Sequence, residues 1–147
     1  MTKVYLSLGT NLGDKEKNIT EAIKRIGELV GVVIRQSALY ATKPWGFESD
    51  NDFINAAVCV ETNLTPRDLL AATQSIERDM GRKEKSKDGK YHDRLIDIDI
   101  LIYGNEHIDE SDLKIPHPLM MERDFVMKPL REILADEDKT EELAQKL

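Results

Sequence analysis

The sequence has little of what marks secreted, membrane-spanning or disulfide-stabilised proteins. It contains one cysteine among 147 residues, so no intramolecular disulfide can form and nothing indicates an oxidising compartment. No apolar run approaches the length that crosses a bilayer. The first residues, Met1 to Val4, enter an apparent strand without the charged and then apolar regions of a signal peptide. We therefore expect a cytoplasmic protein with no membrane partner.

Basic residues are in deficit, because 28 Asp and Glu face 21 Lys and Arg and leave a net charge of −7. This balance argues against a protein that holds nucleic acid over a broad surface, since phosphate contacts need clustered Lys and Arg. The exception is residues 82–94, where six Lys or Arg against three Asp or Glu leave +3. On composition alone a solvated charged loop is the commoner interpretation, but the segment also suits a small polyanion such as a nucleotide.

Several common catalytic and cofactor motifs are missing. The glycine-containing turn at residues 7–13 lacks the Gly-Lys-Ser/Thr ending of a phosphate-binding loop and does not match the dinucleotide fingerprint. No zinc-type spacing of Cys and His and no nucleophile elbow occur. With 40% hydrophobic and 33% charged residues, the composition is that of a globular protein, and the length fits a single domain over residues 1–147.

Strand and helix signals alternate along most of the chain. Strands are expected at residues 4–8, 32–40, 53–61 and 95–103. Apolar residues at helical spacing predict helices after Asp14 and after Thr65, each a suitable N-cap. The order β-α-β-β-α-β predicts an α+β sandwich, with a mostly antiparallel sheet, both helices on one face and the other face free for ligand or solvent. Residues from about 135 to 147 are expected to form a short helical or frayed tail.

The strand from Leu95 to Ile102 carries two aspartates. Side chains alternate along a strand, so the isoleucines are expected to face the core while Asp97 and Asp99 share the other face, with Cα atoms about 6.5–7 Å apart. The isoleucines are Ile96, Ile98, Ile100 and Ile102. Like charges on one face repel, and a divalent cation such as Mg²⁺, which takes one or two carboxylates plus phosphate oxygens, would neutralise them. The alternative is an ordinary half-exposed strand with its polar residues outside.

Other residues suited to a phosphate or a flat ring occur elsewhere. Arg82 and Arg94 are basic residues of the kind that neutralise charge in phosphoryl transfer, and His117, between two prolines, could donate to a phosphate oxygen. Phe53 and Asn55 share one strand face, where a ring and an amide could stack on a heterocycle and pair with its edge. The alternatives are surface positions for the arginines, the phenylalanine and the amide, and a structural or exposed histidine.

Several segments keep one order along the chain to about Leu130. They are Ser7–Leu12, Phe53–Val58, Gln74 with Glu77, Gly81–Arg82, Arg94–Leu101, Ile115–Pro118, Arg123 and Phe125. In this order and roughly this spacing they resemble the 6-hydroxymethyl-7,8-dihydropterin pyrophosphokinases. The Arg…Asp-x-Asp strand followed by Pro-His-Pro is the most specific part of the resemblance.

The family transfers pyrophosphate from ATP to the hydroxymethyl group of the pterin and releases AMP. The resemblance therefore implies an ATP- and Mg²⁺-dependent diphosphotransferase of folate synthesis with a ferredoxin-like sandwich, expected to act as a monomer. Two Mg²⁺ ions are implied at Asp97 and Asp99, which form the implied catalytic set together with Arg82 and Arg94. The implied ATP contacts are Gln74, Glu77, Arg82, Arg94, Ile100, His117 and Arg123. The implied pterin contacts are Thr42, Pro44, Trp45, Asn55, and the ring-sandwiching Phe53 and Phe125.

The chain departs from the commonest family pattern in the basic segment 82–94. That segment is slightly longer, and Glu84 and Tyr91 stand where many members carry arginine and tryptophan, while Asp112 replaces a basic residue of some members. Lys83, Lys85, Lys87 or Lys90 could supply the positive charge over ATP in place of that arginine. The rival hypothesis is a non-catalytic nucleotide- or ligand-binding regulatory module of the same topology, which would bind without consuming ATP. An RNA-binding module is disfavoured by the acidic charge.

Overall fold

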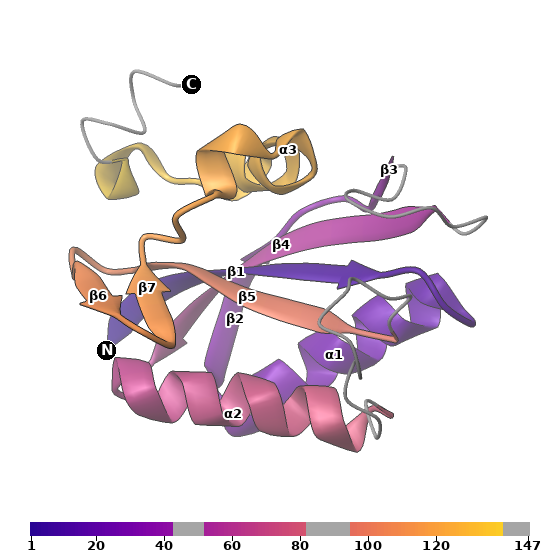
Figure 1. Cartoon of the computed structure of the whole chain (residues 1–147), viewed down its shortest axis with the longest axis horizontal. Coiled ribbons are helices and arrows are strands. Elements are labelled where there is room, and N and C mark those ends of the chain that lie inside the picture. The colour runs from indigo at the N-terminus through magenta and orange to yellow at the C-terminus, as the bar shows by residue number, and fades with distance from the viewer. Residues whose placement is uncertain (43–51, 82–94, 140–147) are drawn as a thin grey trace.

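The fold is organised around one antiparallel sheet. A computed structural model describes residues 1–42, 52–81 and 95–139. Its strands and longer helices, arranged as in Figure 1, are β1 (Thr2–Thr10), α1 (Lys15–Leu29), β2 (Gly31–Gln36), β3 (Tyr40–Thr42), β4 (Phe53–Thr62), α2 (Pro66–Asp79), β5 (Asp97–Tyr103), β6 (Ile108–Glu110), β7 (Leu113–Ile115) and α3 (Asp124–Ile133). Two short 3-10 helices flank α3, at Met120–Glu122 and Asp136–Asp138.

The sheet has the strand order β2-β4-β1-β5, with β3 also paired to β4, and these pairings are all antiparallel. The mixed fold of helices and antiparallel sheet predicted from the sequence is therefore confirmed. The predicted strand over 32–40 is instead two short strands, because the chain leaves the ladder at Ser37. There the Ser37 hydroxyl oxygen accepts a hydrogen bond from Ala57 N at 2.9 Å, in place of a backbone carbonyl.

Helices α1 and α2 cover one face of the sheet (Figure 1). The Asp14 carboxylate accepts from Lys17 N at 3.1 Å at the start of α1. The Thr65 hydroxyl accepts from Asp68 N at 3.2 Å at the start of α2, so both predicted N-caps are confirmed. Apolar residues at helical spacing turn toward the sheet and form the larger core with alternate residues of the strands. The buried residues of the two helices are Ile19, Ala22, Ile26, Leu69, Thr73, Ile76 and Glu77.

Helix α3 packs on the opposite face of the sheet from α1 and α2 (Figure 1). A second apolar cluster joins buried residues of α3, including Met127 and Leu130, to Tyr5 of β1 and Ala57 of β4. The prediction that this face stays free is therefore wrong where α3 covers it. Pro129 lies inside α3, and an internal proline weakens the helical signal in a sequence.

The predicted alternation of β5 fails at its end. Three isoleucines, at 96, 98 and 100, lie in the core under α1 and α2 as expected, but Ile102 packs in the α3 cluster beside Leu101. The pairing of β1 with β5 shifts register between Tyr5 and Leu6. An extra residue on one strand reverses the alternation beyond it, so Ile102 belongs to the other face.

β2 begins at a glycine that the packing requires. Gly31 is paired with Thr62 of β4, and a Cβ at Gly31 would overlap the carbonyl oxygen of Glu61. The Thr62 hydroxyl also donates to Val30 O at 2.6 Å, which ties the end of α1 to the same point. The connection from α1 into the sheet is therefore too close for any side chain at position 31.

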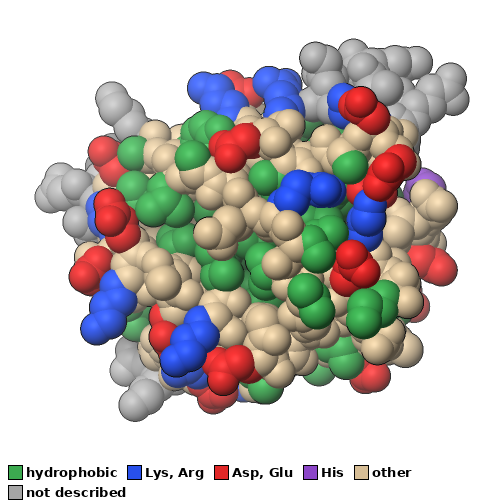
Figure 2. Space-filling view, turned by 180° about the vertical axis from the view of Figure 1, so that it is seen from behind, with side chains coloured by type: hydrophobic (Ala, Val, Ile, Leu, Met, Phe, Trp, Pro, Cys, Tyr) green, Lys and Arg blue, Asp and Glu red, His purple; other side chains and the backbone are tan. Residues whose placement is uncertain are grey.

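The surface seen from behind Figure 1 mixes hydrophobic side chains with charged ones of both signs (Figure 2). Lys and Arg are interspersed with Asp and Glu there, so the described part of this face has no continuous basic track. The exposed large hydrophobic side chains of the described residues include Leu29, Val32 and Leu39. Of the helices that the structure describes, none combines the length and the apolar character needed to cross a membrane.

Candidate active site at one end of the sheet

The candidate site lies on the α3 side of the sheet, where the ends of three strands meet. Gly9 of β1 is paired with Asn55 of β4 on one side and with Asp97 of β5 on the other. Adjacent strands are about 4.8 Å apart, so Asn55 and Asp97 are separated by roughly 10 Å across the glycine. A Cβ at Gly9 would lie 3.0 Å from Asn55 Oδ1. Gly9 itself adds no side chain between the amide and the carboxylate, and the space over it borders the Asn55 amide and a ring carbon of Phe53, 3.8 Å from such a Cβ.

Asp97 and Asp99 occupy alternate positions of β5. Both are half-buried, and they are paired with Gly9 and Ser7 of β1. Ile98 between them is buried in the core under α1 and α2. The prediction that the two carboxylates share the face opposite the isoleucines is confirmed in this part of the strand.

Glu77 of α2 fixes β5 between its two aspartates. Its side chain is buried, with 6% exposure, and Oε2 accepts a hydrogen bond from Ile98 N at 2.9 Å. β5 is an edge strand of the sheet, so a helix carboxylate occupies a place where a neighbouring strand would otherwise pair. The nucleotide contact implied for Glu77 by the resemblance stays a prediction.

Glu77→Ala is expected to lower the free energy of unfolding by about 1–3 kcal/mol, because the Ile98 N–H loses its acceptor in a buried place. Urea denaturation followed by circular dichroism measures the difference. Gln74→Ala is the control on the same helix, since Gln74 is exposed and surface changes usually alter stability by about 0.5 kcal/mol or less. Equal stability of Glu77→Ala and the unaltered protein would contradict the role of Glu77 in fixing β5.

His117 interacts electrostatically with both Arg123 and Asp97. Its backbone N donates to Leu101 O at 3.0 Å, which ties it to β5. Burial lowers the pKa of His117, the positive charge of Arg123 lowers it further, and Asp97 opposes both by raising it. Nδ1 accepts from Leu119 N at 3.3 Å, so the neutral ring carries its proton on Nε2. A neutral histidine with an Nε2–H donor suits a phosphate oxygen.

The start of α3 presents a cation and an aromatic ring together. Arg123 is the N-cap residue of α3, and Phe125 lies in the first turn. The guanidinium carbon of Arg123 lies 5.7 Å from the centre of the Phe125 ring, within the range of a cation–π contact. The same helix end therefore offers one group for a phosphate and one for a flat ring.

Three of the residues predicted to contact a flat ring also come together. Asn55 is 3% exposed, and its Nδ2 donates to Thr42 Oγ1 at 2.9 Å. Thr42 of β3 is paired with the half-buried Phe53 of β4. Because Nδ2 is engaged by Thr42, the amide of Asn55 is fixed with Oδ1 on the side of Gly9.

The remaining predicted site residues lie elsewhere. Gln74 is exposed on α2, and Ile100 is 6% exposed and packs in the core under α1 and α2. Four predicted residues fall outside the described residues: Pro44, Trp45, Arg82 and Arg94. The structure thus brings together an acidic and basic group (Asp97, Asp99, His117, Arg123 with Phe125) and an amide and aromatic group (Thr42, Phe53, Asn55).

Ser7 and Gly9 share this face but are not among the site residues predicted from the sequence. Ser7 is buried beside Asp99, and Gly9 separates Asn55 from Asp97. Their alternation along β1 was an available signal, since every second residue of a strand shares a face. The turn that follows is held by Asn18, whose Nδ2 donates to Thr10 Oγ1 at 3.1 Å and to Leu12 O at 2.8 Å.

Comparison with known proteins gives one consistent result. The family model described as 7,8-dihydro-6-hydroxymethylpterin-pyrophosphokinase matches residues 5–135. A protein of Porphyromonas gingivalis named 2-amino-4-hydroxy-6-hydroxymethyldihydropteridine pyrophosphokinase is 46% identical over 134 residues, which are 90% of this chain and 91% of that protein. A protein of the same name from Bacillus subtilis is 38% identical over 136 residues, which are 92% of this chain and 80% of that protein.

Solved structures show a similar fold at low sequence identity. A crystal structure of an HPPK-DHPS protein in complex with substrates matches with a TM-score of 0.70 and 17% identity, over 90% of this chain and 40% of that one. The wild-type Plasmodium falciparum HPPK-DHPS protein with SDX-DHP matches with a TM-score of 0.69 and 18% identity, over 96% and 41%. The chain therefore spans about two fifths of the length of these structures, and the likeness concerns the fold alone.

Proposed function

Because the chain belongs to the 7,8-dihydro-6-hydroxymethylpterin-pyrophosphokinase family, we propose that its residues perform that reaction at the end of the sheet described above. The chain is a pyrophosphokinase of folate synthesis and acts on a pterin. ATP is the implied donor, so pyrophosphate passes to 6-hydroxymethyl-7,8-dihydropterin and AMP leaves. The observation that supports this site best is the row of Asn55, Gly9 and Asp97, which places an amide and a carboxylate on either side of a glycine.

The carboxylate pair fits magnesium. Asp97 and Asp99 are half-buried on one strand face, and two adjacent negative charges there favour a hard cation with oxygen ligands. Within residues 1–42, 52–81 and 95–139, no group of three or more His, Cys, Asp or Glu could hold a metal by itself. Two Mg²⁺ ions held by Asp97 and Asp99 would therefore take their other ligands from phosphate and water. When bound, they supply neutralisation of the phosphate charge.

The phosphate end of ATP is assigned to the basic side of the site. His117 offers an Nε2–H donor and Arg123 a guanidinium, and the electrostatic effect of Asp97 reaches His117. Arg82 and Arg94, which lie outside the described residues, are assigned as further phosphate contacts and complete the catalytic set. The contacts that the resemblance implies for Gln74, Glu77 and Ile100 assign the rest of the nucleotide to the edge of β5 beside α2, outside the α3 side of the sheet.

The pterin is assigned to the amide side of the site. Asn55 Oδ1, on the side of Gly9, accepts hydrogen bonds from the N–H groups of the ring. Phe53 and Phe125 stack on its two faces, and Thr42 holds the amide in place. Pro44 and Trp45, outside the described residues, complete this set.

The chemistry needs positioning more than covalent help. The pterin hydroxymethyl oxygen attacks the β-phosphorus, the bond from that phosphorus to the α-phosphate oxygen breaks, AMP leaves, and the hydroxyl proton is released. The residues align the hydroxyl with the phosphorus and neutralise charge on the transferred group.

The test is AMP formation by the purified protein with ATP, 6-hydroxymethyl-7,8-dihydropterin and Mg²⁺. AMP and the pterin diphosphate are expected in equal amounts, separated by ion-exchange chromatography. Excess EDTA should abolish the reaction, and Mg²⁺ added beyond the EDTA should restore it, because the phosphate charge is otherwise not neutralised. Undiminished AMP formation in EDTA would contradict the magnesium assignment, and no AMP under full conditions would contradict the function.

The strand order β2-β4-β1-β5 with α1 and α2 on one face supports a ferredoxin-like sandwich. We also propose a single domain that acts as a monomer in the cytoplasm. The net charge of −7 supports the absence of a nucleic-acid partner.

A further inference from the structure

Glu132 in the last turn of α3 is an exposed carboxylate with an unusually complete set of partners. Its Oε1 and Oε2 accept from Ala38 N at 3.1 and 3.0 Å. Its Oε1 also accepts from the Tyr40 hydroxyl at 2.6 Å, and this hydrogen bond raises the pKa of Tyr40. An exposed carboxylate paired with one flexible side chain contributes little to stability. Hydrogen bonds from a backbone N–H and a tyrosine hydroxyl instead fix the position of the Glu132 carboxylate.

The two partners of Glu132, Ala38 and Tyr40, belong to the segment that leads into the proposed pterin site. Ala38 is in the connection between β2 and β3, and Tyr40 is the first residue of β3. Tyr40 is paired with Asn55, and Thr42, at the other end of β3, accepts the hydrogen bond that fixes the Asn55 amide. β3 has three residues, so its own pairing with β4 holds it weakly.

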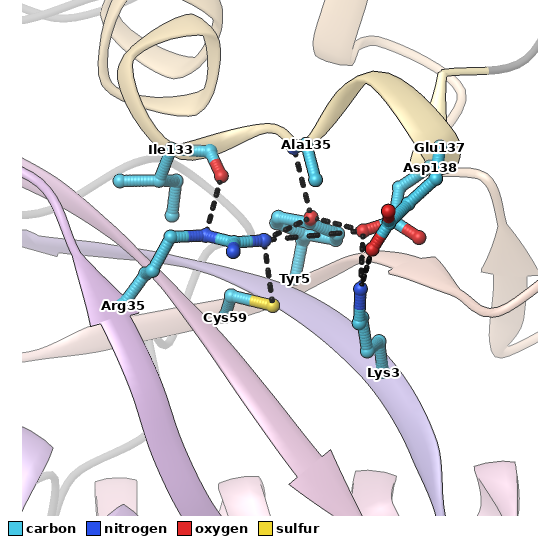
Figure 3. Close-up of polar contacts among 8 residues, drawn as sticks. All are labelled: Lys3, Tyr5, Arg35, Cys59, Ile133, Ala135, Glu137 and Asp138. Carbon is cyan, nitrogen blue, oxygen red and sulfur yellow. Dashed lines mark hydrogen bonds and ion pairs between the residues drawn. The ribbon is translucent and has the colours of Figure 1, made fainter.

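Helix α3 also borders the proposed pterin site, since Phe125 lies in its first turn. Its far end is fastened to the sheet independently of Glu132 (Figure 3). Arg35 Nε donates to Ile133 O at 2.9 Å, and Arg35 Nη2 donates to the Tyr5 hydroxyl at 3.1 Å. The Tyr5 hydroxyl in turn donates to Asp138 Oδ2 at 2.6 Å, with a pKa that burial raises. Figure 3 shows these groups meeting under the end of α3.

We propose that Glu132 is a positioning residue for the pterin. Its hydrogen bonds couple α3, which carries Phe125, to β3, which carries Thr42, and so keep a constant distance between these two sides of the ring site. The inference rests on the proposed pterin site. The contact through Arg35 and Tyr5 fixes α3 to the sheet, but only the contacts of Glu132 fix β3 to α3 among the hydrogen bonds just described. Losing it lets Thr42 and the Asn55 amide shift relative to Phe125.

A positioning role predicts a selective kinetic change. Glu132→Ala should raise KM for the pterin about fivefold to thirtyfold, which is less than the full effect of one or two hydrogen bonds to a charged group, because Glu132 acts on the pterin only through β3. KM for ATP should stay within about twofold, because the phosphate groups are on the side of Asp97 and His117. Glu132→Gln keeps a side-chain acceptor, so its KM for the pterin should lie between those of the unaltered protein and Glu132→Ala. Tyr40→Phe should add little in the Glu132→Ala background, because both changes remove the same contact.

The matched controls separate this role from general stability. Glu28→Gln on α1 changes an exposed glutamate far from the site and should leave both KM values unaltered. Arg131→Ala, the exposed neighbour of Glu132 on α3, tests whether any change on that turn has the same effect. Thermal melting of each variant is recorded beside the kinetics.

Three results would overturn the inference. They are an unaltered pterin KM in Glu132→Ala, an equal rise in the KM of both substrates that follows a loss of melting temperature, and a rise as large in Arg131→Ala. If the unaltered protein is active and any of these results is obtained, only the positioning role of Glu132 is overturned. An unaltered protein that forms no AMP overturns the proposed function, and the inference with it.

Discussion

Asp97→Asn is expected to lower kcat for AMP formation by about 10³-fold or more while the protein stays folded. Asparagine keeps the size of the side chain and one oxygen, but it removes the negative charge that would hold Mg²⁺ beside the phosphates. Asp97 lies at the start of β5, half-buried and paired with the side-chain-free Gly9. Steady-state kinetics at saturating ATP and pterin, with Mg²⁺ varied, measure the loss.

The control for this variant is Asp109→Asn. Asp109 is an exposed residue of β6 that pairs with Lys114 across the β6–β7 hairpin, and exposed pairs contribute about 1 kcal/mol or less. Its kcat should remain close to that of the unaltered protein. Circular dichroism checks that both variants are folded. A folded Asp97→Asn protein with kcat within tenfold of normal would remove Asp97 from the metal site.

Gly31→Ala is expected to destabilise the protein by about 3 kcal/mol, among the largest effects of a single methyl group. The Cβ would overlap the Glu61 carbonyl oxygen, which belongs to the backbone of β4, a strand paired on both sides, and cannot turn aside as a side chain can. To relieve the overlap β2 must move away from β4 and break its pairing with Thr62. Urea denaturation gives the change in the free energy of unfolding.

Gly27→Ala is the matched control, and its expected sign is opposite. Gly27 is exposed inside α1, and a Cβ there would meet no atom within 4 Å. Alanine in a helix interior is about 0.5–1 kcal/mol more favourable than glycine, so this variant should be stabilised. If both variants shifted in the same direction, the close approach at Gly31 would not be the reason for the loss.

Elements fixed by nearby residues were predictable from the sequence. Asp14 and Thr65 cap their helices as expected, because a capping side chain bonds to a backbone N–H three residues away. The alternation around Asp97 and Asp99 was predictable for the same reason, since it depends only on the period of a strand. The break at Ser37 was not, because it depends on a hydrogen bond from Ala57, twenty residues away.

The arrangement of the site depends on contacts between distant residues. Asn55 and Asp97 could each be proposed from the sequence, but their common partner Gly9 follows from the strand order. The contact of Glu132 with Tyr40 spans ninety-two residues and leaves no local pattern. The family resemblance predicted which residues belong to the site. Their alignment across neighbouring strands follows only from the pairing of the sheet.

The meeting of β1, β4 and β5 at Gly9 also links the ligand to the stability of the whole fold. Positions 9, 55 and 97 become neighbours only when the sheet is assembled, so an unfolded or half-folded chain has no such site. A ligand that binds the native state alone at a hundred times its Kd adds about 2.7 kcal/mol to the free energy of unfolding. In a cell, a rising supply of pterin and ATP would therefore lower the population of unfolded chains. The protein would be better protected from proteolysis when its substrates are abundant.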